Sequence, residues 1–340
     1  MAVAFVLDTM KYTFPFFIFL VLSVSSFAQK MKVPPAPPKA VVAAPTVSKN
    51  DLPKIRLLED TMHQLSNRLT YDTSITRRKE GCYAFIPKLV EALKIDNSFY
   101  YPFDSLETVA KIYPPDSSFR ILTWQLVLPH GHFRYYGVIQ MKSTKMKIFP
   151  LHDLRDTMLY QSQLITGNDN WYGCLYYNII QKQVNNKPVY TLFGFEAADA
   201  LTRRKVVDIL TFGSNGKPSF GAPLFYFKYE DSSRVKLTDT LTRFFIEYKY
   251  TASTVLNYDQ KMEMIVFDHV APPSEKAKGA TFTYVPDGTY EGFVWKNNRW
   301  NWVEKVFTFA INEDDNPPIP VPLFGEPRKQ PQLPKDGDPR

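Results

Sequence analysis

The chain has 340 residues, of which 15% are aromatic, and it carries a formal net charge of +7 at pH 7. This length is sufficient to bury one large hydrophobic core or two modest ones. The basic balance favours anionic partners such as phosphate-bearing glycolipids. Because the charges are scattered and no basic, aromatic-interleaved motif is present, nucleic acid is excluded as a partner.

Residues 1–28 have the pattern of a signal peptide. Lys11 precedes an apolar run over residues 14–24, and the small residues Ser26 and Ala28 lie at the −3 and −1 positions of a cleavage site before Gln29. The run is shorter than the roughly 20 apolar residues that a membrane span needs. We therefore expect export, to the periplasm or the extracellular space, with no transmembrane span after cleavage.

The composition predicts one folded domain between two proline-rich ends. Residues 29–48 are rich in proline and alanine and indicate an extended tether, and residues 316–340 indicate a proline-rich disordered tail. The intervening residues 49–315 are predicted to form a single β-rich domain with N-terminal helices within residues 49–115. A crossover at residues 151–164 is expected to be either helical or irregular.

Two helices are expected at the start of this domain. Over residues 52–69, leucine, isoleucine and methionine recur every three or four positions, and Asn50 or Asp51 is placed to cap the helix. A second helix over residues 74–93 is interrupted by Gly81 and Pro87, which predicts a kink or two shorter pieces. A short helical turn is expected at residues 105–111.

Strands are predicted to dominate from residue 119 onward. Residues 120–128 and 133–141 flank Pro129-His130-Gly131-His132 and indicate a hairpin. Residues 171–229 hold four apolar runs separated by Asn-, Asp- or Gly-containing turns, which predicts an antiparallel meander. Residues 171–180 are apolar on both faces, which is typical of a central, doubly covered strand. Further strands are expected at residues 145–150, 241–250, 254–258, 261–268, 280–285, 290–296 and 300–310.

These elements predict an α+β fold that is mainly antiparallel β. The N-terminal helices would pack on a curved meander sheet, or on a sandwich, of about ten or more strands. An incomplete propeller-like stack is the alternative.

Four residues are weak candidates for catalysis. Glu196 and Asp208 lie inside apolar runs near the basic residues 203–205, where they would be either an acid–base pair or structural ion pairs. Asp268 and His269 end a strand and precede a proline-rich turn, a position that can face a cleft. The sequence has no nucleophile elbow, phosphate-binding loop, dinucleotide fingerprint or calcium loop, so whether the protein is an enzyme stays open and no cofactor is expected.

Aromatic residues supply candidates for binding. Trp295, Trp300 and Trp302 flank the tight turn at residues 296–299, and they form either an exposed aromatic site or a cross-strand clamp. Trp171, Tyr172, Tyr176 and Tyr177 form either a stacking platform for sugars or peptides or part of a buried core. The triplets at residues 77–79 and 203–205 are the densest basic spots, and their second interpretation is a solvated helix face and a solvated turn, respectively.

Histidine and cysteine give no strong site. His130 and His132, with His152 and either Asp153 or Asp156, have a spacing that zinc could use, but Gly131 makes the first pair a turn, so no metal is expected. Cys82 and Cys174 either form a disulfide that ties the second helix to the meander or are buried free thiols.

The runs LFGFEAADALTRRKVVDILTFGSNGKPSFGAPLF (residues 192–225) and LNYDQKMEMIVFDHVAPP (residues 256–273) resemble segments of secreted proteins of unknown function from Bacteroidota-type bacteria. The resemblance covers roughly residues 121–306. It implies export and a β-rich body, and it carries no activity onto any residue.

Two functions are compatible with these features. The first is an exported, non-catalytic envelope or secreted protein that binds a surface polymer or a partner protein. The alternative is a hydrolase that acts on an envelope or extracellular polymer, which requires at least two of the candidate acid–base groups to line one cleft.

Overall fold

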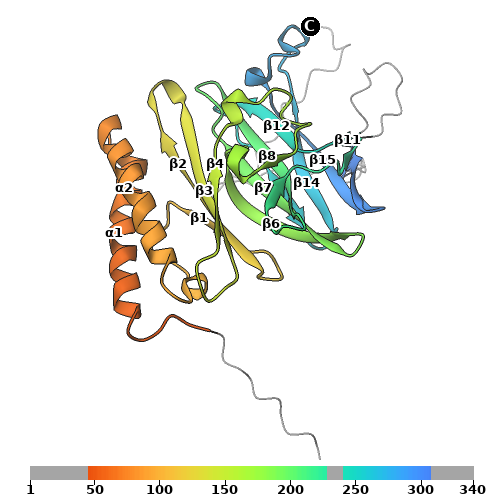
Figure 1. Ribbon diagram of the computed structural model, residues 1–340. Helices are drawn as coiled ribbons and strands as arrows, with labels where there is room; N and C mark the ends of the chain where they lie inside the picture. Colours follow the sequence, from red (N-terminus) through yellow and green to blue (C-terminus); the bar gives the residue numbers. More distant parts are fainter. Residues whose placement is uncertain (1–44, 228–239, 308–340) are drawn as a thin grey trace, which may run out of the picture. The chain divides into compact units, whose positions relative to one another are not determined.

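The computed structural model describes residues 45–227 and 240–307 (Figure 1). The predicted signal peptide, most of the tether, and the C-terminal tail therefore lie outside the described residues. No helix in the described part is long and apolar enough to cross a membrane.

The two predicted helices are present and pack side by side. They are α1 (Leu52–Tyr71) and α2 (Ile75–Leu93). Asp51 is the N-cap of α1, although its side chain makes no capping hydrogen bond, and the Ser74 hydroxyl accepts the Arg77 N–H at the start of α2. The second helix runs unbroken past Gly81 and Pro87, so the prediction of two shorter pieces is wrong.

The first sheet follows the helices and contains four antiparallel strands in sequence order. They are β1 (Ala110–Ile112), β2 (Phe119–Val127), β3 (Phe133–Met141) and β4 (Ile148–His152). The predicted hairpin is confirmed as β2 and β3, and His130 in its loop has a left-handed φ of 58°. The helical turn expected at residues 105–111 is absent: β1 occupies the end of that segment, and a 3₁₀ turn lies earlier, at Ser98–Tyr100.

The second sheet has the order β5-β9-β8-β7-β6, and β12 pairs with the part of β8 that β9 does not cover. Its strands are β5 (Thr166–Gly167), β6 (Leu175–Val184), β7 (Lys187–Glu196), β8 (Thr202–Phe212), β9 (Pro218–Phe220) and β12 (Phe244–Lys249). The expectation that residues 171–180 form a central strand is wrong, because β6 is an edge strand. The expected cover on both faces is present, since Ile179 and Ile180 pack into two different hydrophobic cores.

The third sheet has the order β11-β10-β16-β15-β14-β13, with β10 and β16 parallel. Its strands are β10 (Phe225–Tyr226), β11 (Thr240–Leu241), β13 (Leu256–Asp259), β14 (Met264–Ala271), β15 (Val285–Lys296) and β16 (Arg299–Val303). The strand expected at residues 280–285 is instead the 3₁₀ helix η6 (Thr281–Thr283), which leads into β15.

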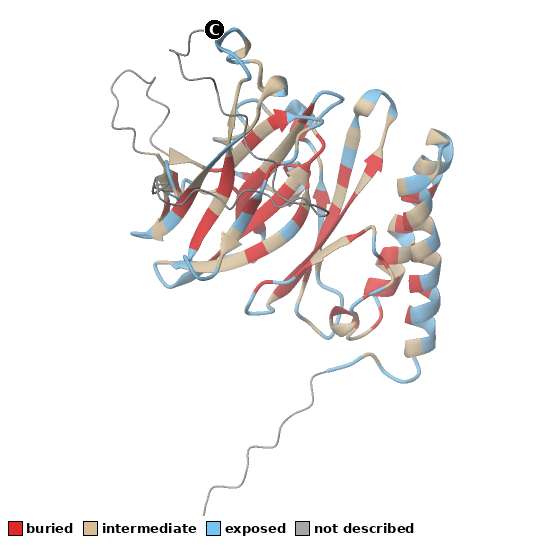
Figure 2. Ribbon diagram, turned by 180° about the vertical axis from the view of Figure 1, so that it is seen from behind, coloured by how far each residue is buried: buried red, intermediate tan, exposed pale blue. Residues whose placement is uncertain are grey.

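Three hydrophobic cores hold these layers together. The first joins the helices to the first sheet, the second joins the first and second sheets, and the third joins the second and third sheets. Successive residues of a strand point to opposite faces, so one strand contributes to two cores. In β2, Ile121 faces the second core and Leu122 faces the first. In β7, Leu192 faces the second core and Phe193 faces the third. Figure 2 shows the buried residues along the strands and on the inner sides of the helices.

The predicted fold class is confirmed. The described residues form two long helices and sixteen mainly antiparallel strands, with the helices against one face of a β body whose strands curl (Figure 1). The layers stack face to face, so the propeller-like alternative does not apply.

Candidate functional site

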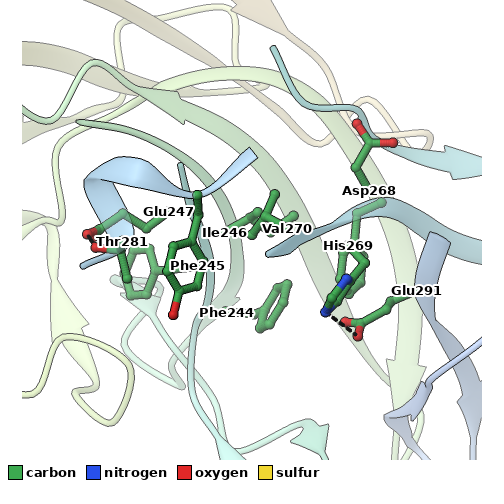
Figure 3. Close-up of a pocket in the computed structure, with 11 residues that line it drawn as sticks. Phe244, Phe245, Ile246, Glu247, Asp268, His269, Val270, Thr281 and Glu291 are labelled. Carbon is green, nitrogen blue, oxygen red and sulfur yellow. Dashed lines mark hydrogen bonds and ion pairs between the residues drawn. The ribbon is translucent and has the colours of Figure 1, made fainter. Parts of the chain in front are cut away.

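A cleft of about 310 Å³ opens between β12 and β14. The close-up in Figure 3 shows its lining: Glu247 and Thr281 lie at one end, His269 and Glu291 at the other, and apolar side chains lie between them. Its lining residues are Phe244, Phe245, Ile246, Glu247, Phe267, Asp268, His269, Val270, Thr281, Tyr284 and Glu291. A cavity of this size holds a small ligand or one unit of a polymer.

A strand irregularity brings Asp287 beside His269. The pairing of β14 with β15 shifts register between Asp268 and Val270: only His269 separates these two residues on β14, whereas residues 287–289 separate their partners on β15. The extra residues of this bulge therefore belong to β15, and they include Asp287. The His269 ring lies with Nδ1 at 2.7 Å from Asp287 Oδ2 and Nε2 at 3.9 Å from Glu291 Oε1.

The two carboxyl groups beside His269 have different environments. Burial raises the pKa of Glu291, and the repulsion from Glu304 and Asp287 acts in the same direction. At Asp287 burial also favours the neutral form, but hydrogen bonds from Thr289 and His269 outweigh it and lower the pKa. Carboxyl groups whose pKa values are pushed apart suit acid and base roles at one site.

The opposite end of the cleft connects to buried charges. Glu247 accepts hydrogen bonds from the Thr281 hydroxyl and from Arg204. Arg204 also lies 3.6 Å from Glu196, which in turn lies 3.1 Å from Arg155. We call these four residues, Glu247, Arg204, Glu196 and Arg155, the buried charge network. It fixes Glu247 in place and neutralises part of its charge.

The structure separates the four predicted catalytic residues. Glu196 is buried in this network, where it also accepts the Tyr172 hydroxyl, and burial raises its pKa in spite of the two arginines. Asp208 is fully buried, and Arg243 Nε lies 2.8 Å from its carboxylate. Both therefore have the structural ion-pair role, and neither lines the cleft.

Asp268 and His269 do line the cleft, but they point in different directions. Asp268 accepts the Val255 N–H at 2.7 Å, and its carboxylate points away from His269 and Glu291 in Figure 3. Of the four predicted acid–base residues, only His269 presents its side chain to the other polar groups of the cleft.

The three tryptophans do not form an exposed shelf. Trp300 is fully buried in the third core, where its indole N–H donates to the Thr191 hydroxyl at 3.1 Å. Trp295 packs edge-on against it, with ring centroids 5.0 Å apart. Trp302 is partly buried and donates to Glu291 at 3.2 Å, so it supports the cleft from behind. A ligand cannot stack on Trp300 without unfolding the core.

The cysteines do not pair. Cys82 lies in the first core and Cys174 in the second, so the first sheet separates them, and both are free. Burial raises the pKa of the Cys82 thiol to about 11 and that of Cys174 well above its ordinary value. The buried-thiol interpretation therefore holds.

Residues 45–227 and 240–307 contain no group of three His, Cys, Asp or Glu side chains arranged to hold a metal ion. His130 lies in the β2–β3 loop, while His152 ends β4, two strands along the sheet from β2.

Sequence analysis missed most of the cleft. Glu247, Asp287 and Glu291 each lie 18 or more residues from His269 in the sequence. Asp287 and Glu291 reach His269 through the pairing of β14 with β15, and Glu247 reaches the cleft through the approach of β12. The Asp287-Gly288 pair resembles an ordinary turn in sequence, so no local signal identifies its role.

No family model matches the chain, and no curated protein or solved structure shows significant similarity to it.

Proposed function

We propose that this is an exported, non-catalytic protein that binds a surface polymer or a partner protein, with the β12–β14 cleft as the binding site. The observation that carries the proposal is the lining of the cleft, in which the aromatic side chains Phe244, Phe245 and Tyr284 lie beside hydrogen-bonding groups at both ends. Apolar walls with a few placed polar groups are the usual composition of a ligand site. The predicted signal peptide supports action outside the cytoplasm.

The proposal is tested by retention of the purified protein on insoluble cell-envelope glycan. His269→Ala and Tyr284→Ala each remove a side chain of the cleft, and Tyr83→Ala removes an exposed ring of α2 as the matched control. We expect at least a tenfold loss of retention for the two cleft variants and none for the control. Equal retention of all four proteins would exclude the cleft as the binding site.

Hydrolysis of the bound polymer is the second candidate, and one observation favours it. His269 is oriented by Asp287 and faces Glu291, whose raised pKa is suited to a proton donor. Release of soluble fragments from the same glycan, lost in Glu291→Gln, would establish this activity. Retention without release would leave binding as the function.

A further inference from the structure

The basic triplet of β8 has two different faces. Strand alternation sends Arg204 to the side of the buried charge network and sends Arg203 and Lys205 to the opposite side. The interpretation of this triplet as a solvated turn is therefore wrong, because all three residues belong to a strand that pairs with β7 and β12.

Arg203 and Lys205 are held by aromatic rings. Lys205 Nζ lies 4.9 Å from the ring centroid of Tyr177 and 5.5 Å from that of Phe195. The Arg203 guanidinium lies 5.8 Å from the Phe195 centroid and 4.3 Å from that of Tyr250. Rings and cations thus alternate in the order Tyr177, Lys205, Phe195, Arg203, Tyr250. We call these five residues the basic–aromatic ladder.

The sheet register builds this ladder. Phe195 is the direct partner of Lys205 across β7 and β8, and Tyr250 follows the end of β12, which pairs with β8 beside Arg203. Tyr177 lies at the register shift between Tyr176 and Asn178 in β6, where the extra residue of a bulge is redirected. Tyr177 is 40% exposed and Tyr250 43% exposed, so the rings at both ends are accessible to a ligand.

The two cations of the ladder have no acidic counterpart. Among residues 45–227 and 240–307, no carboxylate lies within ion-pair distance of Arg203 or Lys205, whereas Arg204 between them lies near two. Arg203 Nε is buried without a hydrogen-bond partner in that part of the chain. Burial lowers the pKa of Lys205, and no neighbouring acid offsets it. Partly buried charges are normally paired with an opposite charge. Arg203 and Lys205 have no such partner in the described residues, so a bound anion would complete the pairing of both.

The spacing suits one tetrahedral anion. Residues two apart on a strand have Cα atoms about 7 Å apart on the same face, and long side chains from such positions can converge on a single group. A phosphate would supply acceptor oxygens to the Lys205 ammonium and to the terminal guanidinium nitrogens of Arg203. Tyr177 and Tyr250 would offer flat faces to a sugar ring at either side of that phosphate.

We propose that the basic–aromatic ladder is a binding site for a phosphorylated saccharide, with Arg203 and Lys205 on the phosphate and the tyrosine rings on the sugar. This site is distinct from the β12–β14 cleft and does not depend on the function proposed for it. The phosphorylated saccharide can be a soluble molecule or the head group of a glycolipid.

Calorimetric titration of the full chain with glucose 6-phosphate, inorganic phosphate and glucose tests the site. We expect glucose 6-phosphate to bind more tightly than inorganic phosphate, and glucose not to bind. Lys205→Gln and Arg203→Gln should each weaken binding about tenfold, the typical loss for one charge-assisted hydrogen bond. The matched control is Lys187→Gln, which changes an exposed lysine at the start of β7 and should alter the affinity less than twofold.

Several outcomes would overturn the proposal: no binding of glucose 6-phosphate, equal affinity for inorganic phosphate, or equal weakening by the control. A rise in the melting temperature of the unaltered protein with glucose 6-phosphate gives a readout that needs no variant. Flotation with vesicles that contain a phosphate-bearing glycolipid, with a neutral glycolipid as reference, distinguishes the sources. Selective flotation that glucose 6-phosphate abolishes identifies the lipid head group, and titration without flotation identifies the soluble saccharide.

Discussion

Asp208 and Arg243 lie 2.8 Å apart, and both side chains are completely buried. Tyr176 donates to the same carboxylate at 3.3 Å, and the Arg243 guanidinium lies 5.1 Å from the ring centroid of Tyr172. The removal of one partner from such a pair leaves an uncompensated buried charge, which typically costs 3–5 kcal/mol. Asp208 therefore serves the fold, and loss of activity in an Asp208 variant would not identify a catalytic residue.

Glu291 gives a prediction about pH. Its folded-state pKa is raised by burial, so the folded protein keeps a proton that the unfolded chain loses above a pKa of about 4.3. The resulting stabilisation is complete below that unfolded pKa and is lost as pH rises through the folded pKa. Glutamine cannot lose this proton and still accepts the Trp302 N–H. We expect the stability of Glu291→Gln, relative to the unaltered protein, to rise between pH 4 and pH 7.

Urea denaturation at several pH values measures this difference. Glu275→Gln, at an exposed position in a 3₁₀ turn, is the control and should show no such trend. A constant difference between Glu291→Gln and the unaltered protein across this range would contradict a raised pKa.

At the scale of the element, the contact between α1 and α2 depends on Gly81. A Cβ at this position would lie 3.2 Å from Leu65 O and 3.2 Å from Leu69 N, both backbone atoms of α1. The helices therefore approach closely because the side chain is missing, which also explains why a glycine is tolerated in the middle of α2.

We expect Gly81→Val to destabilise the protein by about 1–3 kcal/mol through overpacking. Ala84→Val introduces the same β-branched residue on the exposed side of α2 and should cost only about 0.5 kcal/mol, from helix propensity. Chemical denaturation of both variants measures the two costs. Equal destabilisation would show that the helix contact tolerates a side chain at residue 81.

Two strand bulges illustrate how elements position candidate ligand contacts. One extra residue in β6 redirects Tyr177 toward Lys205, and the extra residues of β15 opposite His269 place Asp287 beside that ring. A single-residue shift changes the face of a strand on which a side chain lies. The alternation of apolar and polar residues in the sequence does not show where such a shift occurs.

At the scale of the whole molecule, three stacked cores separate the two cysteines. A disulfide that closes the loop between residues 82 and 174 would contribute about 4.6 kcal/mol on the chain-entropy model. Because both thiols are free and lie in different cores, we expect dithiothreitol to leave the urea midpoint unchanged. Alkylation of the denatured, unreduced protein should label two thiols. Labelling of the two thiols only after reduction, together with a lower urea midpoint in dithiothreitol, would contradict the structure.

The sequence alone determined the elements with strong local periodicity. The apolar stripe over residues 52–69 predicted α1, and the turn around Gly131 predicted the β2–β3 hairpin, because these patterns act within one or two elements. It also indicated the mainly antiparallel class. It left the roles of Glu196 and Asp208 open between acid–base chemistry and ion pairing.

Only the tertiary structure decided which residues meet. The charges of Arg204 and Lys205 are adjacent in sequence, yet one is neutralised by Glu196 and Glu247 and the other has no carboxylate partner in the described part of the chain. Burial, pairing and exposure arise from contacts between strands that are distant in sequence. The cleft around His269 and the basic–aromatic ladder both depend on such contacts, since strand register and layer stacking determine which side chains share a surface.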